Sequence, residues 1–463
     1  MRHTACHDDG VNRVRQSSAT ADDLDEAVGG ARRRFVERHP ESRRWAGEAR
    51  AVLAGGNSRS SLDVEPFPIR IARAEGAALW DVDGIRYVDL LGDFTAGLLG
   101  HNPAPVLAAA GRALERGWAL GAVHRDEVRL AAAVVERFPS IEHVRFTNSG
   151  TEANLMALAV SVHHTGRRRI VVCQHAYHGG VLTFGTTPDP INVPHDWLMI
   201  PYNDIAAVDH AFAREGGDVA AVLVEPVQGA AGCFPGDPEF LGALRARCTD
   251  HGALLIFDEV MTSRLSRGGA QLALAITPDL TTLGKYLGGG LSFGAFGGRR
   301  DVMAHFDRAG GGTLSHAGTF NNNVATMAAG LAVLTEVLAD DGVLTATNAR
   351  GDRLREALGE TFQRHDIPMC ATGTGSLVNV HGTVGPVHSA ADVVDADDRW
   401  KELFYFAALD AGFYLARRGF IALSIEVTDT DIEAFLDVVD AWGASWRGPA
   451  AGWRISAGLR PRE

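Results

Sequence analysis

The chain has 463 residues, of which 46% are hydrophobic and 22% are charged, a balance typical of a globular protein with a sizeable core. Its formal net charge of -13 at pH 7 excludes a broad basic surface for nucleic acid or an anionic membrane. No apolar run approaches the roughly 20 residues that span a bilayer, and the length alone predicts roughly two to four domains.

The first 20 residues mix His, Arg, Asp and Ser and lack the apolar segment of a signal peptide. We therefore expect residues 1–20 to form a disordered leader. His3, Cys6 and His7 have the spacing of metal ligands, but nothing in a leader would preorganise them, so we expect no metal site. The five cysteines are odd in number and scattered, which indicates reduced thiols and a cytoplasmic protein.

Helical periodicity extends over residues 21–53. It is interrupted at Gly29-Gly30 and closed by Gly55-Gly56, so we expect a helix break at the first pair. A strand-like stretch at residues 69–73 follows, and Asp83-Gly84 predicts a hairpin turn.

From about residue 101 to residue 338, helical runs alternate with short apolar strands. Continuous apolar strands of this kind indicate an α/β fold with a mostly parallel sheet that helices flank. We expect residues 101–338 to form a large domain. Residues 21–100 and 339–463 would together form a smaller α+β domain. The predicted strands of the sheet include residues 144–146, 170–172, 220–224 and 253–257.

Only two lysines occur among the 44 Lys and Arg residues. Arginine replaces lysine as a solvated cation, but it cannot lose its proton to become a nucleophilic amine. Lys401 lies in a charged helical stretch and is expected at the surface. Lys285 lies in an apolar, glycine-rich setting, which fits either a Schiff-base amine or a strand-end lysine that reaches back to solvent.

Polar residues follow several of the predicted strands, where open parallel sheets bind their ligands. Ser149, Gly150 and Thr151 open a helix and could hold phosphate, although an ordinary helix cap would look the same. Tyr177 could stack on a planar ring or belong to the core.

Two carboxylates also follow strands. Glu225 places an acid at the rim of the sheet, after the strand at 220–224. Asp258 comes directly after five apolar residues, where a carboxylate is costly unless it meets a cation. A protonated pyridine nitrogen would be such a partner, and a helix N-cap is the alternative.

A phosphate cradle, a stacking ring, an acid for a ring nitrogen and an amine for an aldehyde are together what pyridoxal 5′-phosphate (PLP) requires. Their order, with the phrases Phe257-Asp258-Glu259-Val260 and Thr282-Leu283-Gly284-Lys285, resembles the class III aminotransferases of PLP fold type I. The resemblance covers about residues 45–440. The segment 318–323 resembles one that reaches the phosphate of the neighbouring subunit, which implies a homodimer.

The resemblance implies that Lys285 binds PLP as a Schiff base and moves a proton, and that Asp258 pairs with the pyridinium nitrogen. Tyr177 would stack on the ring, and Thr319 of the partner subunit would help to hold the phosphate. The residues implied to bind the cofactor are Ser149, Gly150, Thr151, Tyr177, Glu225, Asp258, Lys285 and Thr319.

Within the family, the stretches 56–60, 146–157 and 257–264 look like the β-phenylalanine (β-amino acid) aminotransferases, which are relatives of glutamate-1-semialdehyde 2,1-aminomutase. This likeness implies a β-amino acid donor and a 2-oxo acid acceptor such as 2-oxoglutarate or pyruvate. An intramolecular aminomutase is the alternative. A binding protein that has lost catalysis is a third hypothesis, against which the full set of chemical groups argues.

A cation must recognise the substrate carboxylate. Arg59 matches the position of such an arginine in the family, and Arg418 is a second candidate. The chain departs from the family pattern at Asp93-Phe94-Thr95 and at Arg417, both expected to line or shape the pocket. A carboxylate at Asp93 would favour a polar or amine-bearing substrate.

Overall fold

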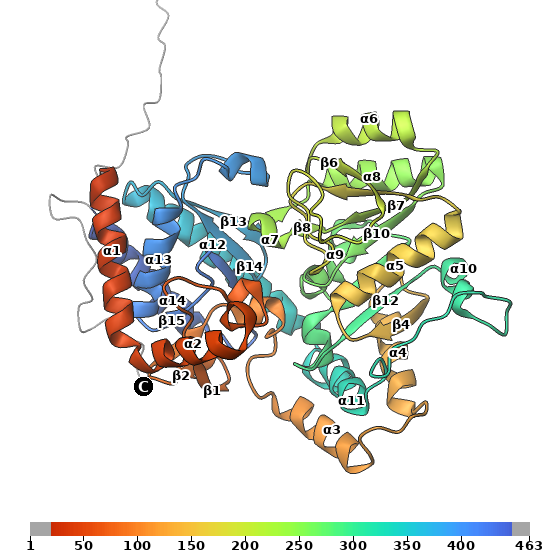
Figure 1. The fold of residues 1–463 in the computed structure, drawn as a ribbon, viewed down its shortest axis with the longest axis horizontal. Helices are drawn as coiled ribbons and strands as arrows, with labels where there is room; N and C mark the ends of the chain where they lie inside the picture. Colours follow the sequence, from red (N-terminus) through yellow and green to blue (C-terminus); the bar gives the residue numbers. More distant parts are fainter. Residues whose placement is uncertain (1–19, 447–463) are drawn as a thin grey trace, which may run out of the picture.

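The computed structural model describes residues 20–446, which form an α/β fold (Figure 1). Its largest sheet has seven strands in the order β4-β12-β11-β10-β7-β5-β6. Every neighbouring pair is parallel except the two that involve β12, so the mostly parallel sheet is confirmed. The strands are β4 (His143–Thr147), β5 (Arg169–Cys173), β6 (Asp196–Ile200), β7 (Val219–Val224), β10 (Leu254–Asp258), β11 (Leu280–Gly284) and β12 (Gly294–Gly298).

Helices cover both faces of this sheet. On β12, the adjacent residues Ala295 and Phe296 belong to two different hydrophobic clusters, and neighbouring side chains of a strand point to opposite faces. The cluster of Phe296 includes residues of α5 (Gly150–Thr165), α6 (Ile205–Glu215) and α8 (Pro238–His251). The cluster of Ala295 includes residues of α3 (Ala104–Glu115), α4 (Arg125–Arg137) and α11 (Val324–Ala332).

The two ends of the chain pack together beside the large sheet, where Figure 1 shows red and blue elements side by side. Two small sheets lie there, in the orders β1-β2-β3-β15 and β13-β14-β16. The helices are α1 (Ala21–Arg38), α2 (Pro40–Val52), α12 (Asp341–Arg364), α13 (Asp398–Asp410) and α14 (Asp429–Ala444). The strands are β1 (Ile71–Glu75), β2 (Ala78–Asp81), β3 (Arg86–Asp89), β13 (Cys370–Thr374), β14 (Leu377–His381), β15 (Phe413–Tyr414) and β16 (Phe420–Ala422).

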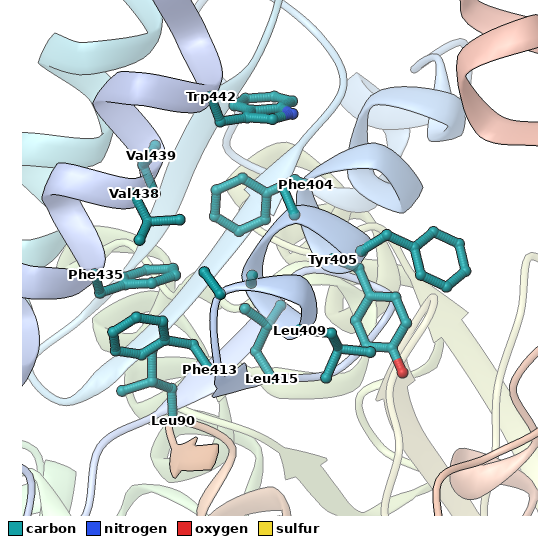
Figure 2. Packing of buried hydrophobic residues seen from close by; sticks show 14 of the residues in the cluster. Leu90, Phe404, Tyr405, Leu409, Phe413, Leu415, Phe435, Val438, Val439 and Trp442 are labelled. Carbon is teal, nitrogen blue, oxygen red and sulfur yellow. The ribbon is translucent and has the colours of Figure 1, made fainter. Parts of the chain in front are cut away.

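One hydrophobic cluster joins these segments. Figure 2 shows Leu90, from the N-terminal part, packed with Phe413 and Phe435 from the C-terminal part. The aromatic rings of Phe413 and Phe435 have centroids 5.1 Å apart. A shared core of this kind fits a smaller unit built from both ends, while the domain boundaries at 100/101 and 338/339 stay predictions.

The predicted helix break at Gly29-Gly30 is wrong, because α1 runs unbroken to Arg38. A helical glycine costs about 1 kcal/mol, and four buried residues on one face, from Leu24 to Phe35, outweigh that cost. The break comes instead at Pro40, the first residue of α2. Thr20, predicted as the end of the leader, caps α1 by accepting a hydrogen bond from the amide of Asp23.

Other sequence predictions agree with the structure within a residue or two. The strand expected at 69–73 is β1, two residues further on, and the four predicted strands of the large sheet are β4, β5, β7 and β10. Gly84 has φ of 82° in the predicted hairpin turn. Gly55 and Gly56, with φ of 70° and 77°, follow the end of α2.

Only some of the cysteines and possible metal ligands lie within the described residues. His3, Cys6 and His7 lie outside the described residues. Within residues 20–446, no group of three metal-binding side chains is close enough to hold an ion, and no helix is both long and apolar enough to cross a membrane. Cys173, Cys233, Cys248 and Cys370 are free thiols.

Candidate active site

The residues predicted to act on a cofactor gather at one edge of the seven-stranded sheet. The strands β4, β5, β7, β10 and β11 run in the same direction, so their carboxyl ends meet there. The segments that follow these ends contain Ser149–Thr151, His175–Gly180, Glu225, Asp258 and Lys285.

Asp258 ends β10 as a carboxylate with 5% relative exposure. Its Oδ2 accepts hydrogen bonds from Nδ1 of His178 and from Nδ2 of Asn154, both at 2.8 Å. Its Oδ1 accepts one from the amide of Val260 at 3.0 Å. The residues after Asp258 form a turn and a short 3-10 helix, so the alternative of an α-helix N-cap is wrong.

Asn154 ties this carboxylate to the neighbouring elements. From α5, its Nδ2 also donates to the carbonyl oxygen of His178 at 2.9 Å. Its Oδ1 accepts a hydrogen bond of 2.7 Å from the hydroxyl of Thr282 on β11. Asp258, His178 and Thr282 are all buried, so these hydrogen bonds hold the Asp258 carboxylate in one position.

Lys285 follows β11, and its amine does not extend into solvent. Its Nζ donates a hydrogen bond of 2.8 Å to the carbonyl oxygen of Phe94. Burial lowers the pKa of Lys285 from 10.5 to about 8, an effect that the carboxylates of Asp258, Glu225 and Asp93 oppose. A lysine with this lowered pKa has more neutral amine near neutral pH than an ordinary lysine, and the neutral form is the nucleophile.

Glu225 lies at the same edge with 7% relative exposure. Its two carboxyl oxygens accept hydrogen bonds from the amides of Tyr177 and Gly229, each at 3.0 Å. Burial raises the pKa of Glu225 to about 7, and the nearby charge of Asp258 adds to this effect. Glu225 thereby fixes the backbone at Tyr177 and brings a second acid beside the Asp258 carboxylate.

The start of α5 has the form of an anion site. Ser149 is the N-cap, and its hydroxyl accepts a hydrogen bond of 3.2 Å from the amide of Glu152. The first amides of a helix have no intrahelical partner and can bind phosphate. Gly179 lies against this turn, since a Cβ at that position would be 2.1 Å from Oγ1 of Thr151. The ordinary cap is therefore present, and the phosphate role stays a prediction.

Two predicted cofactor residues present exposed side chains. Tyr177 is 48% exposed, so the alternative that it belongs to the core is wrong, while its stacking role stays a prediction. Thr319 is also exposed. Its segment touches the cradle of its own chain, because Asn148 donates a hydrogen bond of 3.0 Å to Asn321.

The structure places Arg59 and Arg418 near one aromatic ring, and Asp93 pairs with Arg59. The guanidinium carbon of Arg59 is 5.7 Å from the ring centroid of Phe94, and that of Arg418 is 5.3 Å away. Arg59 Nη1 is paired with Asp93 Oδ1 at 2.7 Å. Within residues 20–446, the one polar contact of Arg418 is a 3.5 Å hydrogen bond to the carbonyl oxygen of Ala230.

Arg417 forms an ion pair with a residue of the smaller unit. Its Nη2 pairs with Oε2 of Glu402 at 2.7 Å, on the side of α13. Glu402 also pairs with Arg32 of α1 at 2.6 Å. The departure at Arg417 therefore belongs to an ion-pair network that joins the two ends of the chain, and its expected part in lining or shaping the pocket stays a prediction.

The donor set fits PLP. A buried, hydrogen-bonded carboxylate suits a protonated ring nitrogen, a desolvated amine suits an aldehyde, and a helix N-terminus suits a phosphate group. Asp258, Lys285 and Ser149–Thr151 supply these three groups at one sheet edge. The fold and this donor set together define a PLP-dependent enzyme of fold type I.

Comparison with known proteins agrees with this class. Residues 60–398 match the family described as aminotransferase class-III, so the chain belongs to the class III aminotransferases and is a PLP-dependent transaminase. It is 49% identical to a β-phenylalanine transaminase of Variovorax paradoxus over 419 residues, 90% of this chain and 96% of that protein.

Solved structures show the same fold. A crystal structure of a β-phenylalanine aminotransferase from Variovorax paradoxus matches with a TM-score of 0.89, over 90% of this chain and 97% of that one. An omega-transaminase from Sphaerobacter thermophilus matches at 33% identity with a TM-score of 0.83, over 89% and 100% of the two chains. A glutamate-1-semialdehyde aminomutase from Pseudomonas aeruginosa, at 24% identity, has a TM-score of 0.82 over 90% and 97%, a likeness of fold alone.

Sequence reasoning missed three contributors to the site. The sequence patterns assign no role to His178, which follows Tyr177, or to Asn154 in the stretch 146–157, and they mark Phe94 only as a departure from the family. A signal for His178 is present, since it is a histidine in the loop after a parallel strand. The contact of Phe94 with Lys285 joins residues 191 positions apart through a backbone carbonyl, for which a sequence has no signal.

Proposed function

We propose that this transaminase moves the amino group of a β-amino acid, of the β-phenylalanine kind, to a 2-oxo acid such as 2-oxoglutarate or pyruvate. The observation that carries the proposal is the 49% identity to a β-phenylalanine transaminase over nearly the full length of both proteins. The geometry of the site is compatible with it, because two guanidinium groups lie near the ring of Phe94, and the carbonyl oxygen of the same residue accepts the hydrogen bond of Lys285.

PLP, when bound, supplies an aldehyde that condenses with an amine and a protonated ring that accepts the electron pair of a broken C–H bond. Asp258 would keep the ring nitrogen protonated, since an ionised carboxylate favours a neighbouring positive charge. His178 and Asn154 hold that carboxylate in place. Ser149, Gly150 and Thr151 would hold the phosphate at the start of α5.

Lys285 would act as the acid–base group. Its Nζ has a pKa near 8. The amine can therefore take a proton from the substrate carbon and later release this proton to a second atom, without a large free-energy cost for the uptake or the release. The carbonyl oxygen of Phe94 accepts a hydrogen bond from this amine and so orients it. A positioned acid–base group of this kind contributes roughly 10²–10⁴-fold to a rate.

Arg418 and Arg59 would recognise the carboxylates of donor and acceptor. A planar guanidinium can donate two parallel hydrogen bonds to a carboxylate. Arg418 forms no ion pair within the described chain, whereas Arg59 is already paired with Asp93. The two arginines therefore present different electrostatic environments to an incoming anion.

We further propose that the enzyme is a homodimer in which Thr319 of the partner subunit helps to hold the phosphate. The exposed Thr319 and the 64% exposed ring of Phe320 support this arrangement. Sedimentation of the purified protein should give twice the chain mass. A fully active monomer would contradict the dimer and leave the amino-transfer proposal untouched.

The function is tested with a panel of α-, β- and γ-amino donors against 2-oxoglutarate and pyruvate, with the keto-acid product as the readout. We expect turnover of β-phenylalanine that requires an added acceptor. Turnover of an amino-aldehyde without an acceptor, and none of β-amino acids, would favour the aminomutase instead.

A further inference from the structure

Asp93 and Arg59 form an ion pair beside the Lys285 amine. Asp93 Oδ1 lies 2.7 Å from Nη1 of Arg59, while the next residue, Phe94, accepts the hydrogen bond of Lys285 through its carbonyl oxygen. The charge of Asp93 also reaches the lysine, because it raises the pKa of Lys285 against the effect of burial. The pair is therefore within electrostatic reach of the proposed reacting amine.

We infer that Asp93 is an internal competitor for the substrate carboxylate: its side chain occupies the guanidinium of Arg59, and an incoming carboxylate displaces it. This inference rests on the proposed function only in taking Arg59 as a carboxylate-binding group. Asp93 is then a specificity-determining residue that lowers the affinity for any carboxylate ligand, rather than a partner for an amine-bearing side chain.

The ion pair of Arg59 and Asp93 is exposed enough for a ligand carboxylate to replace Asp93. The side chains of Arg59 and Asp93 are 46% and 51% exposed, and no other carboxylate of residues 20–446 pairs with this arginine. Exposed ion pairs of this kind shift an equilibrium by at most about fivefold. A ligand carboxylate can therefore replace Asp93 at a small cost, and that cost sets the expected size of the effect.

The backbone holds Asp93 in place for this exchange. Asp93 and Phe94 have φ of 42° and 51°, in the left-handed region that few residues other than Gly, Asn and Asp adopt readily. The ring of Phe94 stacks on Phe420 with centroids 6.3 Å apart, which anchors the segment next to Asp93. Asn is tolerated in this conformation, so Asp93→Asn removes the charge without adding backbone strain.

The test is the affinity of the holoenzyme for 3-phenylpropanoate, a carboxylate without an amino group, measured by titration calorimetry. We expect Asp93→Asn to tighten binding by about two- to fivefold. The matched control is Asp196→Asn on β6. Asp196 is equally exposed and pairs with Arg169 at 2.8 Å, so its replacement should leave the affinity for 3-phenylpropanoate unchanged. Unchanged or weaker binding in Asp93→Asn, or no binding to either form, would overturn the inference.

A second comparison separates competition at Arg59 from a general effect of charge. In an Arg59→Gln background, Asp93→Asn should no longer improve binding, because the shared guanidinium is gone. Improvement that persists in this background would also overturn the inference. If β-phenylalanine is not a substrate but the binding result holds, the proposed function fails and the role of Asp93 stands.

Discussion

Nδ1 of His178 lies 2.8 Å from Oδ2 of Asp258, and both side chains are buried at the carboxyl edge of the sheet. An ionised carboxylate only accepts hydrogen bonds, so His178 carries a proton on Nδ1 and donates it. Nε2 of His178 has no hydrogen-bond partner in the part of the chain that the structure describes. The hydrogen bond from His178 therefore helps to position the Asp258 carboxylate.

Replacing His178 by Phe should weaken cofactor binding. An aromatic ring is kept, but Asp258 loses one of its two side-chain donors, and a hydrogen bond to a charged group contributes roughly 1.5–3 kcal/mol. We expect cofactor affinity to fall about tenfold or more, measured by fluorescence titration of the apo-protein. An unchanged affinity would show that Asn154 and the Val260 amide suffice to hold the carboxylate.

Gly179→Ala should damage the proposed phosphate cradle. Gly179 has φ of 126°, and a Cβ there would be 2.1 Å from Oγ1 of Thr151, so the start of α5 must shift. The matched control is Gly180→Ala, where a Cβ meets nothing within 4 Å. We expect the first variant to release PLP during dialysis while the second retains it. Equal retention by both variants would argue against the cradle.

Cofactor attachment should depend on pH through Lys285. Only the neutral amine attacks an aldehyde, and the lowered pKa of about 8 means that the folded protein releases this proton below its usual value of 10.5. The attachment rate should rise about tenfold per pH unit below 8 and level off above it. The measurement is the growth of visible absorbance after PLP is added to the apo-protein. A rate that still climbs tenfold between pH 9 and 10 would contradict the lowered pKa.

The core that joins the two chain ends should be essential for stability. Phe35 of α1 is 2% exposed and packs against Phe406 of α13, with ring centroids 5.5 Å apart. Phe35→Ala should lower the free energy of unfolding by about 3–5 kcal/mol, since a large buried ring leaves a cavity. Urea denaturation measures this change. A loss below about 1 kcal/mol would show that α1 is not part of the cooperative unit.

The sequence predicts the fold well where a local pattern determines it. The buried strand β7 and the first four residues of β10 are continuous apolar runs, a pattern typical of the strands of a parallel sheet that is buried on both faces. The break in α1 was misplaced because the penalty for Gly29-Gly30 is local, whereas the packing of Phe35 that outweighs it is tertiary.

The site is predictable only in part, for the same reason. Asp258 and Lys285 are placed by the strands that they follow, so their neighbourhood could be inferred from the order of elements. The pairing of Asp93 with Arg59 depends on a left-handed turn and on two segments 34 residues apart. The ion pair of Arg417 with Glu402 likewise depends on how α13 packs, which the local sequence does not reveal.

The central claim is that Lys285 is the amine that binds PLP, and the chain has one other lysine as a built-in control. Lys401 forms an ion pair with Asp398 at 2.7 Å on α13. Borohydride reduction of the holoenzyme followed by peptide mass spectrometry should find the cofactor on Lys285 in wild type and in Lys401→Arg, and none in Lys285→Arg. Label on Lys401, or a Lys285→Arg enzyme with full visible absorbance and normal turnover, would contradict the account.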